Sequence, residues 1–302
     1  MAAIFRNLIL FKLKKFAVEA RALEEVLSAH SLQACGNTEA KSFGWVRPKG
    51  KGHPFVHQHL HHLLITMGVE EKLLPGSVVD RFVLARAAEI EEREGHKPGR
   101  KVLREIRDQV EHELLPRAFS IGKNVDAWID SQSGLFVVNA GSEGDAEDLI
   151  SYFGKQVSTD DFVVGLLRTV NSPASVMTQW LASGEVPSSF MIDRDCELKG
   201  SGDEKDAIRY VNHDLGAKEI PEYIAAGKTV TKLALTWQGK ISFVLTDKFH
   251  LKKVTPLDLL KEENINEDQF DGDFAMMTGE FPQLLCDLID AMGGVPDETA
   301  TS

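Results

Sequence analysis

The chain has 302 residues, of which 43% are hydrophobic, and its formal net charge is −12. This length and apolar content exclude a disordered chain and predict a globular protein with one large core or two to three smaller ones. The acidic balance argues at first against a nucleic-acid partner, because nonspecific binders take most of their affinity from neutralised phosphates.

Neither targeting nor disulfide signals are evident. The apolar run over residues 4–13 is too short and too interrupted by charge for a signal peptide, and no later run is long enough to span a bilayer. Cys35, Cys196 and Cys286 are scattered and form no CxxC pair, which suits reduced thiols better than a disulfide framework or a zinc knuckle. We therefore expect a cytoplasmic protein with no membrane partner.

In chain order, hydrophobic periodicity and turn residues predict a mixture of strands and helices. The first expected elements are a strand over 4–13, a helix over 18–29, an extended stretch at 44–46 and a single strand over 55–67. Ser77 is then expected to cap a long helix, whose apolar positions are Val78, Phe82, Ala85, Ala88 and Ile90. Pro98-Gly99 must interrupt it, so a second helix is expected from Arg100 to Leu115, giving a helical hairpin inserted between strands.

After Pro116 the pattern predicts more strands and amphipathic helices. The expected elements are strands over 125–130 and 135–140, a helix over 144–153, strands around residue 190 and over 228–254, and helices near 219–226, 257–262 and 281–292. The predicted fold class is α+β, with mixed sheets and helices in a chain of several lobes that includes the helical hairpin.

The most informative stretch is the predicted β-hairpin between residues 228 and 245. Alternation places Leu233, Leu235 and Trp237 on one face of its first strand, and Lys228 and Lys232 on the other. From residue 228 to residue 253 there are six lysines and a single acid, Asp247. This local reversal of sign in an acidic protein suggests an anionic partner, and duplex DNA is the one we favour.

A second basic stretch lies in the predicted helical hairpin, while the negative charge gathers near the C-terminus. Between residues 93 and 107 six cations outnumber two acids, and from 258 to 298 there are twelve acids and one base, Lys261. The alternative for each basic run is a solvated helix face with no binding role. Two such runs favour a binding surface.

Several short motifs follow one another in a specific order along nearly the whole chain. They are Cys35-Gly36, Gly44-Trp45-Val46, Glu71-Lys72 before Leu74-Pro75, residues 114–120 (LLPRAFS), Ala226-Gly227-Lys228, residues 230–237 (VTKLALTW), Phe270-Asp271, Asp273-Phe274, residues 277–280 (MTGE) and Gly293-Gly294. In this order and spacing, the chain resembles the recombination-associated protein RdgC family.

That resemblance implies a ring-shaped homodimer, built from central, tip and base domains, that encircles duplex DNA without sequence preference and restrains RecA-driven recombination. It implies a nucleoid-associated protein that is not an enzyme and needs no cofactor. On this chain the expected division is a central domain over 1–75 and 116–170, a helical tip domain over 76–115 and a base domain over 171–302.

The expected binding residues follow from the basic runs and from the resemblance. Phe119 is the candidate dimer contact, with an ordinary core position as its alternative. The family has a lysine-containing stretch where this chain has residues 208–215, so affinity through that loop is in doubt. The candidate DNA-binding residues are Lys97, Arg100, Lys101, Arg104, Arg107, Arg117, Arg209, Asn212, His213, Lys228 and Lys232.

Two other classes stay open. A metal-dependent nuclease would use Asp271 and Asp273 with histidines, and an interaction module would present the acidic C-terminal segment to a recombinase as a DNA mimic. Five histidines lie between His53 and His62, and on one strand His57, His59 and His61 would share a face. No acid or cysteine lies near them in the sequence, so we expect no metal site there.

Overall fold

A computed structural model describes residues 4–158, 160–200, 206–216, 219–257 and 269–296. The strands are β1 Leu8–Phe16, β2 Lys41–Val46, β3 His57–His59, β4 His62–Lys72, β5 Ser120–Asp130, β6 Leu135–Asn139, β7 Phe162–Leu166, β8 Phe190–Gly200, β9 Ala207–Tyr210, β10 Lys228–Trp237, β11 Ile241–Thr246 and β12 Leu251–Pro256. The helices are α1 Ala20–Ala29, α2 Gly76–Glu94, α3 Arg100–Leu114, α4 Glu143–Gly154, α5 Pro173–Ser183, α6 Glu219–Ala225 and α7 Gln269–Ala291, with a 3-10 turn at Leu115–Arg117.

The strands form one sheet that runs through the whole molecule. Its order is β2-β4-β5-β6-β1-β12-β11-β10-β8-β9, with β3 added on β4 and β7 added on β1, and the paired strands are antiparallel. The α+β class is confirmed, but the expected mixture of sheets is wrong, since the described strands join into a single antiparallel sheet. Near its middle β1 meets β12 through the pair Leu8 and Leu251.

The sheet is covered on both faces, which fits the alternation of its side chains. Ile9 and Phe11 on β1 belong to a core that includes Leu23 of α1 and Leu149 of α4. Leu8, from the same strand, belongs to a second core that contains α5, α7 and the β8–β12 strands. The second core includes residues on both sides of position 171, where we expected the base domain to begin. The division of the chain into central, tip and base domains therefore stays a prediction.

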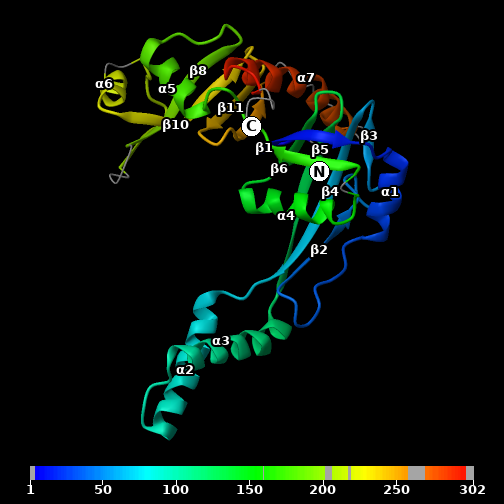
Figure 1. Ribbon diagram of the computed structural model, residues 1–302, viewed down its shortest axis with the longest axis vertical. Helices are drawn as coiled ribbons and strands as arrows, with labels where there is room; N and C mark the ends of the chain where they lie inside the picture. The colour runs from blue at the N-terminus through cyan, green and yellow to red at the C-terminus, as the bar shows by residue number, and fades with distance from the viewer. Residues whose placement is uncertain (1–3, 159, 201–205, 217–218, 258–268, 297–302) are drawn as a thin grey trace.

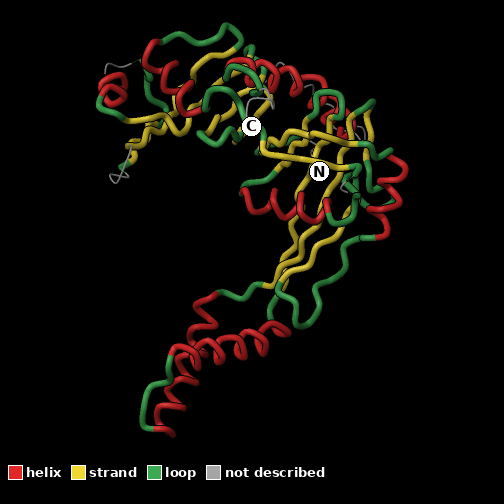
Figure 2. Tube along the Cα trace, viewed as in Figure 1, coloured by secondary structure: helices red, strands yellow, loops and turns green. Residues whose placement is uncertain are grey.

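Figure 1 shows the chain as an open curve, with the α2–α3 hairpin at one end and α5, α6, β8 and β10 at the other. Strands β4 and β5 leave the body together and lead into the hairpin (Figure 2). In the described part of the chain, no helix combines the length and apolar character needed to cross a bilayer.

The inserted helical hairpin is confirmed, but its apolar face differs from the expected one. Val79 and Val83 of α2 pack against Ile106 and Val110 of α3, whereas Phe82 is exposed. Helix α2 begins at Gly76, and no side chain caps it, so the cap expected at Ser77 is wrong. The buried valines lie one residue after the expected positions 78 and 82.

Two other predicted elements change. The single strand expected over 55–67 is the β3–β4 hairpin, whose turn contains Leu60 with φ of 54°. The last helix begins at Gln269, so the helix expected over 281–292 starts earlier than predicted and includes Phe274. The helix expected at 257–262 falls mostly outside the described residues.

Candidate nucleic-acid interface

A buried carboxylate gathers three cations on the face of β8–β10. Glu197 on β8 pairs in register with Arg209 on β9 and with Lys232 on β10, one on each side. Arg209 Nη2 donates to Glu197 Oε2 at 2.7 Å and Lys232 Nζ donates to the same oxygen at 3.0 Å. Lys199 Nζ lies 3.4 Å from Oε1. We name Glu197, Lys199, Arg209 and Lys232 the Glu197 cluster.

This cluster has a net positive charge, because three cations surround one carboxylate and leave two charges over. Burial by itself would raise the pKa of Glu197, but hydrogen bonds from Lys232, Arg209 and Thr231 lower it to about 2. The cations remain accessible, with side-chain exposures of 69% for Arg209, 49% for Lys199 and 41% for Lys232. The carboxylate therefore holds the cations in place without hiding them from an anion.

The neighbouring predicted residues are less available. Lys228 forms an ion pair with Asp206 and its side chain is only 13% exposed. His213 Nε2 lies 3.1 Å from Glu219 Oε1 and its ring stacks on Tyr210. His213 also lines a cavity of about 590 Å³ beside α5, together with Arg194 and Asp214.

Asn212 is exposed, and its backbone N–H donates to Asp195 at 2.7 Å. Its φ of 51° lies in the left-handed region, which asparagine tolerates better than most residues. Its side-chain amide therefore projects from a fixed turn rather than from a strand.

The tip provides a second group of cations at the start of α3. Arg100, Lys101 and Arg104 are exposed and have no ion-pair partner among the described residues, and Lys97 precedes them in the connecting loop. At about 100° per residue, the three α3 side chains span about 100° of the helix surface. We name Arg100, Lys101 and Arg104 the α3 cations.

The α3 cations are placed against the local field. The first turn of α3 contains no acidic residue, and a helix N-terminus favours negative rather than positive side chains. Arg107 differs, since it forms an ion pair with Asp80 and lies 3.7 Å from Glu111. Cations at a helix N-terminus that no acidic side chain offsets are a local departure from favourable electrostatics, and such departures are typical of functional surfaces.

The remaining lysines of the 228–253 stretch do not form one free basic face. Lys240 binds Glu280 of α7 at 2.9 Å, and Lys248 binds Glu143 of α4 at 2.6 Å. Lys253 is exposed, with no ion-pair partner in the described ranges. Much of the local positive charge that the sequence shows is therefore neutralised by acids distant in the sequence.

Phe119 lies where the hairpin joins the sheet. Its side chain is 84% exposed, so the core alternative is wrong. The backbone N–H of Leu73 donates to the carbonyl of Phe119 at 2.7 Å, and Leu73 and Ile121 are also about half exposed. Arg117, in the adjoining 3-10 turn, is exposed as well. An apolar patch of this kind on a projecting stalk suits contact with another protein surface.

The nuclease alternative loses one of its carboxylates to an internal contact. Lys49 Nζ binds both oxygens of Asp271, at 2.7 and 2.8 Å, and lowers the pKa of that carboxyl. The ring of His57 packs edge-on against Phe270 and Phe274. Asp271 and His57 therefore attach α7 to the loop and strand that precede the β3–β4 turn.

The acidic segment proposed as a DNA mimic is similarly engaged where it is described. Asp271 binds Lys49, Glu280 binds Lys240, and Asp287 accepts from the indole N–H of Trp237 at 2.8 Å. These carboxylates face the chain's own groups, so they are not a free surface for a recombinase. Residues 258–268 and 297–298 of the segment lie outside the described ranges.

The family model described as "RdgC: Putative exonuclease, RdgC" matches residues 3–295. The chain belongs to the RdgC family. It is similar to the recombination-associated protein RdgC of Herminiimonas arsenicoxydans, with 42% identity over 96% of this chain and 98% of the relative. It is also similar to the RdgC protein of Dechloromonas aromatica strain RCB, with 43% identity over 96% of this chain and 97% of the relative. The resemblance inferred from the sequence is confirmed, and the chain is an RdgC protein associated by family with recombination.

In this RdgC chain the structure brings together two of the predicted residues, Arg209 and Lys232, from separate strands. Sequence reasoning missed Lys199 and the acid that organises the group, Glu197. The available signal was the presence of acidic residues within the sequence of β8, since an acid that is buried in a sheet requires cationic partners on neighbouring strands.

Proposed function

We propose that this RdgC protein binds duplex DNA without sequence preference, closes around it as a homodimeric ring and thereby restrains RecA-driven recombination. It acts by occupying DNA on the nucleoid in the cytoplasm, and it neither catalyses a reaction nor needs a cofactor. The observation on which the proposal rests is the Glu197 cluster, an exposed group with net positive charge in an acidic protein.

The shape of the chain supports a ring. The Glu197 cluster lies on β8–β10 and the α3 cations lie in the hairpin, so the two groups belong to opposite ends of the open curve in Figure 1. A two-fold partner that meets this chain at both ends would present each group twice around the enclosed space. The exposed patch of Leu73, Phe119 and Ile121 provides apolar area for such a contact.

Nonspecific binding follows from the kinds of groups present. Lysine and arginine side chains on a strand face and on a projecting helix contact phosphates, which supply affinity without sequence information. Each phosphate contact contributes about one unit to the slope of log affinity against log salt. Replacing three cations per protomer should reduce that slope by up to about three for each protomer that contacts DNA.

The test is a gel shift on two unrelated duplexes across a salt series, with and without Mg²⁺ or Mn²⁺. Wild type should shift both duplexes equally and leave them uncut. Lys199→Gln/Arg209→Gln/Lys232→Gln and Arg100→Gln/Lys101→Gln/Arg104→Gln should each bind more weakly, with a smaller salt slope and an unchanged dimer mass.

The matched control is Arg21→Gln/Lys51→Gln/Lys155→Gln, which removes three exposed cations outside both groups. It should bind like wild type if the two groups form the interface. Equal weakening in the control would contradict a localised surface, metal-dependent cutting would favour a nuclease, and the absence of any shift would favour the DNA mimic. A strand-exchange assay with RecA then tests whether the two weakened variants also lose inhibition.

A further inference from the structure

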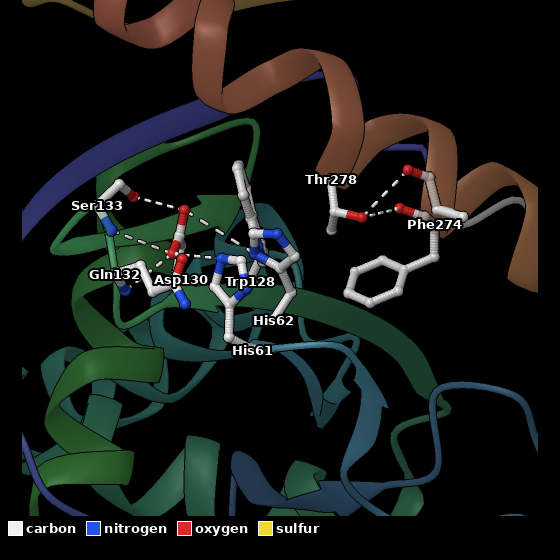
Figure 3. Close-up of polar contacts among 9 residues, drawn as sticks. His61, His62, Trp128, Asp130, Gln132, Ser133, Phe274 and Thr278 are labelled. Carbon is white, nitrogen blue, oxygen red and sulfur yellow. Dashed lines mark hydrogen bonds and ion pairs between the residues drawn. The ribbon is translucent and has the colours of Figure 1, made fainter.

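The β3–β4 turn brings two consecutive histidines against the end of β5. His62 pairs in register with Asp130, and His61 precedes it in the turn (Figure 3). His61 Nε2 lies 3.4 Å from Asp130 Oδ1, and His62 Nδ1 lies 3.9 Å from Asp130 Oδ2. No acid lies near these histidines in the sequence, but Asp130 lies next to them in the folded structure.

The histidine stretch divides into two groups because the chain turns at Leu60. His57 and His59 contact the phenylalanines of α7, so the common face predicted for His57, His59 and His61 is wrong. Among the described residues, His61, His62 and Asp130 are the set whose potential ligand atoms all lie within 4.8 Å of one another.

These separations suit a small cation with three protein ligands. In tetrahedral zinc sites the ligand bonds are about 2.0–2.1 Å, which places neighbouring ligand atoms about 3.4 Å apart. His61 Nε2 already lies at this distance from Asp130 Oδ1. The 3.9 Å from His62 Nδ1 is measured to the other carboxylate oxygen, Oδ2, and needs to shorten by about half an ångström.

Asp130 is held as metal-binding carboxylates are. Its side chain is 3% exposed, and it accepts from the backbone N–H groups of Gln132 and Ser133 and from the Ser133 hydroxyl. A carboxylate has about four acceptor positions, so these contacts fix its orientation and leave room for one more. Within the described ranges, Asp130 has no lysine or arginine in an ion pair, and the two imidazoles are its only potential cationic neighbours.

His62 presents a lone pair to the same space. The indole N–H of Trp128, which can only donate, lies 3.2 Å from His62 Nδ1. His62 Nδ1 is therefore an acceptor with a lone pair, as metal binding requires. A bound cation would replace the indole N–H of Trp128 as the partner of this lone pair. A buried carboxylate that has no lysine or arginine partner among the described residues lacks a permanent compensating charge, which a divalent cation would supply.

We propose that His61, His62 and Asp130 form a binding site for a divalent transition-metal ion of the zinc class, with a fourth position open on the side of His61, whose side chain is 31% exposed. Two imidazoles and one carboxylate favour zinc, nickel or copper over magnesium and calcium, which prefer oxygen ligands. The ion would join the β3–β4 turn to the β5–β6 turn on the side where α7 passes (Figure 3).

The experiment uses untagged, full-length protein stripped with a chelator and titrated calorimetrically with ZnCl₂ alone. Wild type should bind one equivalent, and its thermal midpoint should rise with Zn²⁺ and not with Mg²⁺. His61→Ala and Asp130→Asn should each lower the Zn²⁺ affinity at least tenfold and remove that rise. His61→Ala is the decisive variant, since the side chain is partly exposed, lies in a turn and belongs to none of the hydrophobic cores.

His53→Ala and His57→Ala are the controls, because they remove neighbouring histidines outside the set. Both should bind Zn²⁺ as wild type does. The proposal is overturned if wild type binds no Zn²⁺ at a concentration of about 10⁻⁴ M, or if the folded His61→Ala variant keeps the Zn²⁺ affinity of wild type. Loss of binding in His57→Ala with retention in His61→Ala would overturn it too, by moving the site to the histidines that contact α7.

Discussion

Replacement of Glu197 by glutamine should destabilise the protein by an amount that depends on pH. The substitution keeps the size of the side chain and removes the charge that three cations surround. Folding lowers the pKa of this carboxyl from 4.5 to about 2. A difference of this size corresponds to about 3 kcal/mol of folding free energy at neutral pH.

The sign of the pH dependence follows from the lowered pKa. The carboxylate stabilises the fold fully above pH 4.5, and this contribution is lost as the pH falls from 4.5 toward 2. The difference between wild type and Glu197→Gln should therefore be about 3 kcal/mol at pH 7 and fall to about 2 kcal/mol at pH 3.5.

Urea denaturation followed by tryptophan emission measures this difference, because Trp180 and Trp237 lie in the core beneath β8–β10. Glu185→Gln, at an exposed position in the same half of the chain, is the matched control and should change stability by less than about 0.5 kcal/mol. A Glu197→Gln effect under about 1 kcal/mol, or one that stays constant between pH 7 and pH 3.5, would refute the assignment of Glu197 as the ionised centre of the cluster.

Two more outcomes test the interface and the attachment of α7. Phe119→Ala should weaken dimerisation by ~2 kcal/mol, roughly 30-fold in Kd, while the thermal midpoint of the protein stays unchanged. Leu60→Ala changes another exposed apolar position and should leave the dimer intact in sedimentation. Equal dimerisation of both variants would exclude Phe119 from the contact. Lys49→Met should lower the free energy of unfolding by less than about 1 kcal/mol, because Asp271 is half exposed. The same substitution should speed amide hydrogen exchange in the first turns of α7. Unchanged exchange there would show that the ion pair does not hold the helix.

Sequence patterns predicted the elements with strong local signals. The hairpin of β10 and β11 was predicted because the large apolar residues Leu233, Leu235 and Trp237 alternate with smaller or polar ones, and all three are buried. The α2–α3 hairpin was predicted from Pro98-Gly99, which lies in the loop between the two helices. The β3–β4 turn was missed because its central residue, Leu60, adopts a positive φ without a glycine to announce it.

The candidate site was predictable only in part, because its decisive contacts join distant segments. Arg209 and Lys232 were selected as cations, but nothing local indicates that both reach the oxygen of Glu197. Asp130 was missed beside His61 for the same reason, since 69 residues separate the two in sequence and only the pairing of β4 with β5 brings them together.

The charge that matters for a DNA partner is what remains after internal pairing. Lys228, Lys240 and Lys248 each lose their excess charge to a single carboxylate, so a count of lysines overstates the basic character of their stretch. Around Glu197 the balance is reversed, because one acid organises three cations and leaves two charges unneutralised. An acidic protein can therefore still present a rigid basic surface, since phosphates respond to the local field within about 8–10 Å at physiological salt rather than to the net charge of the chain.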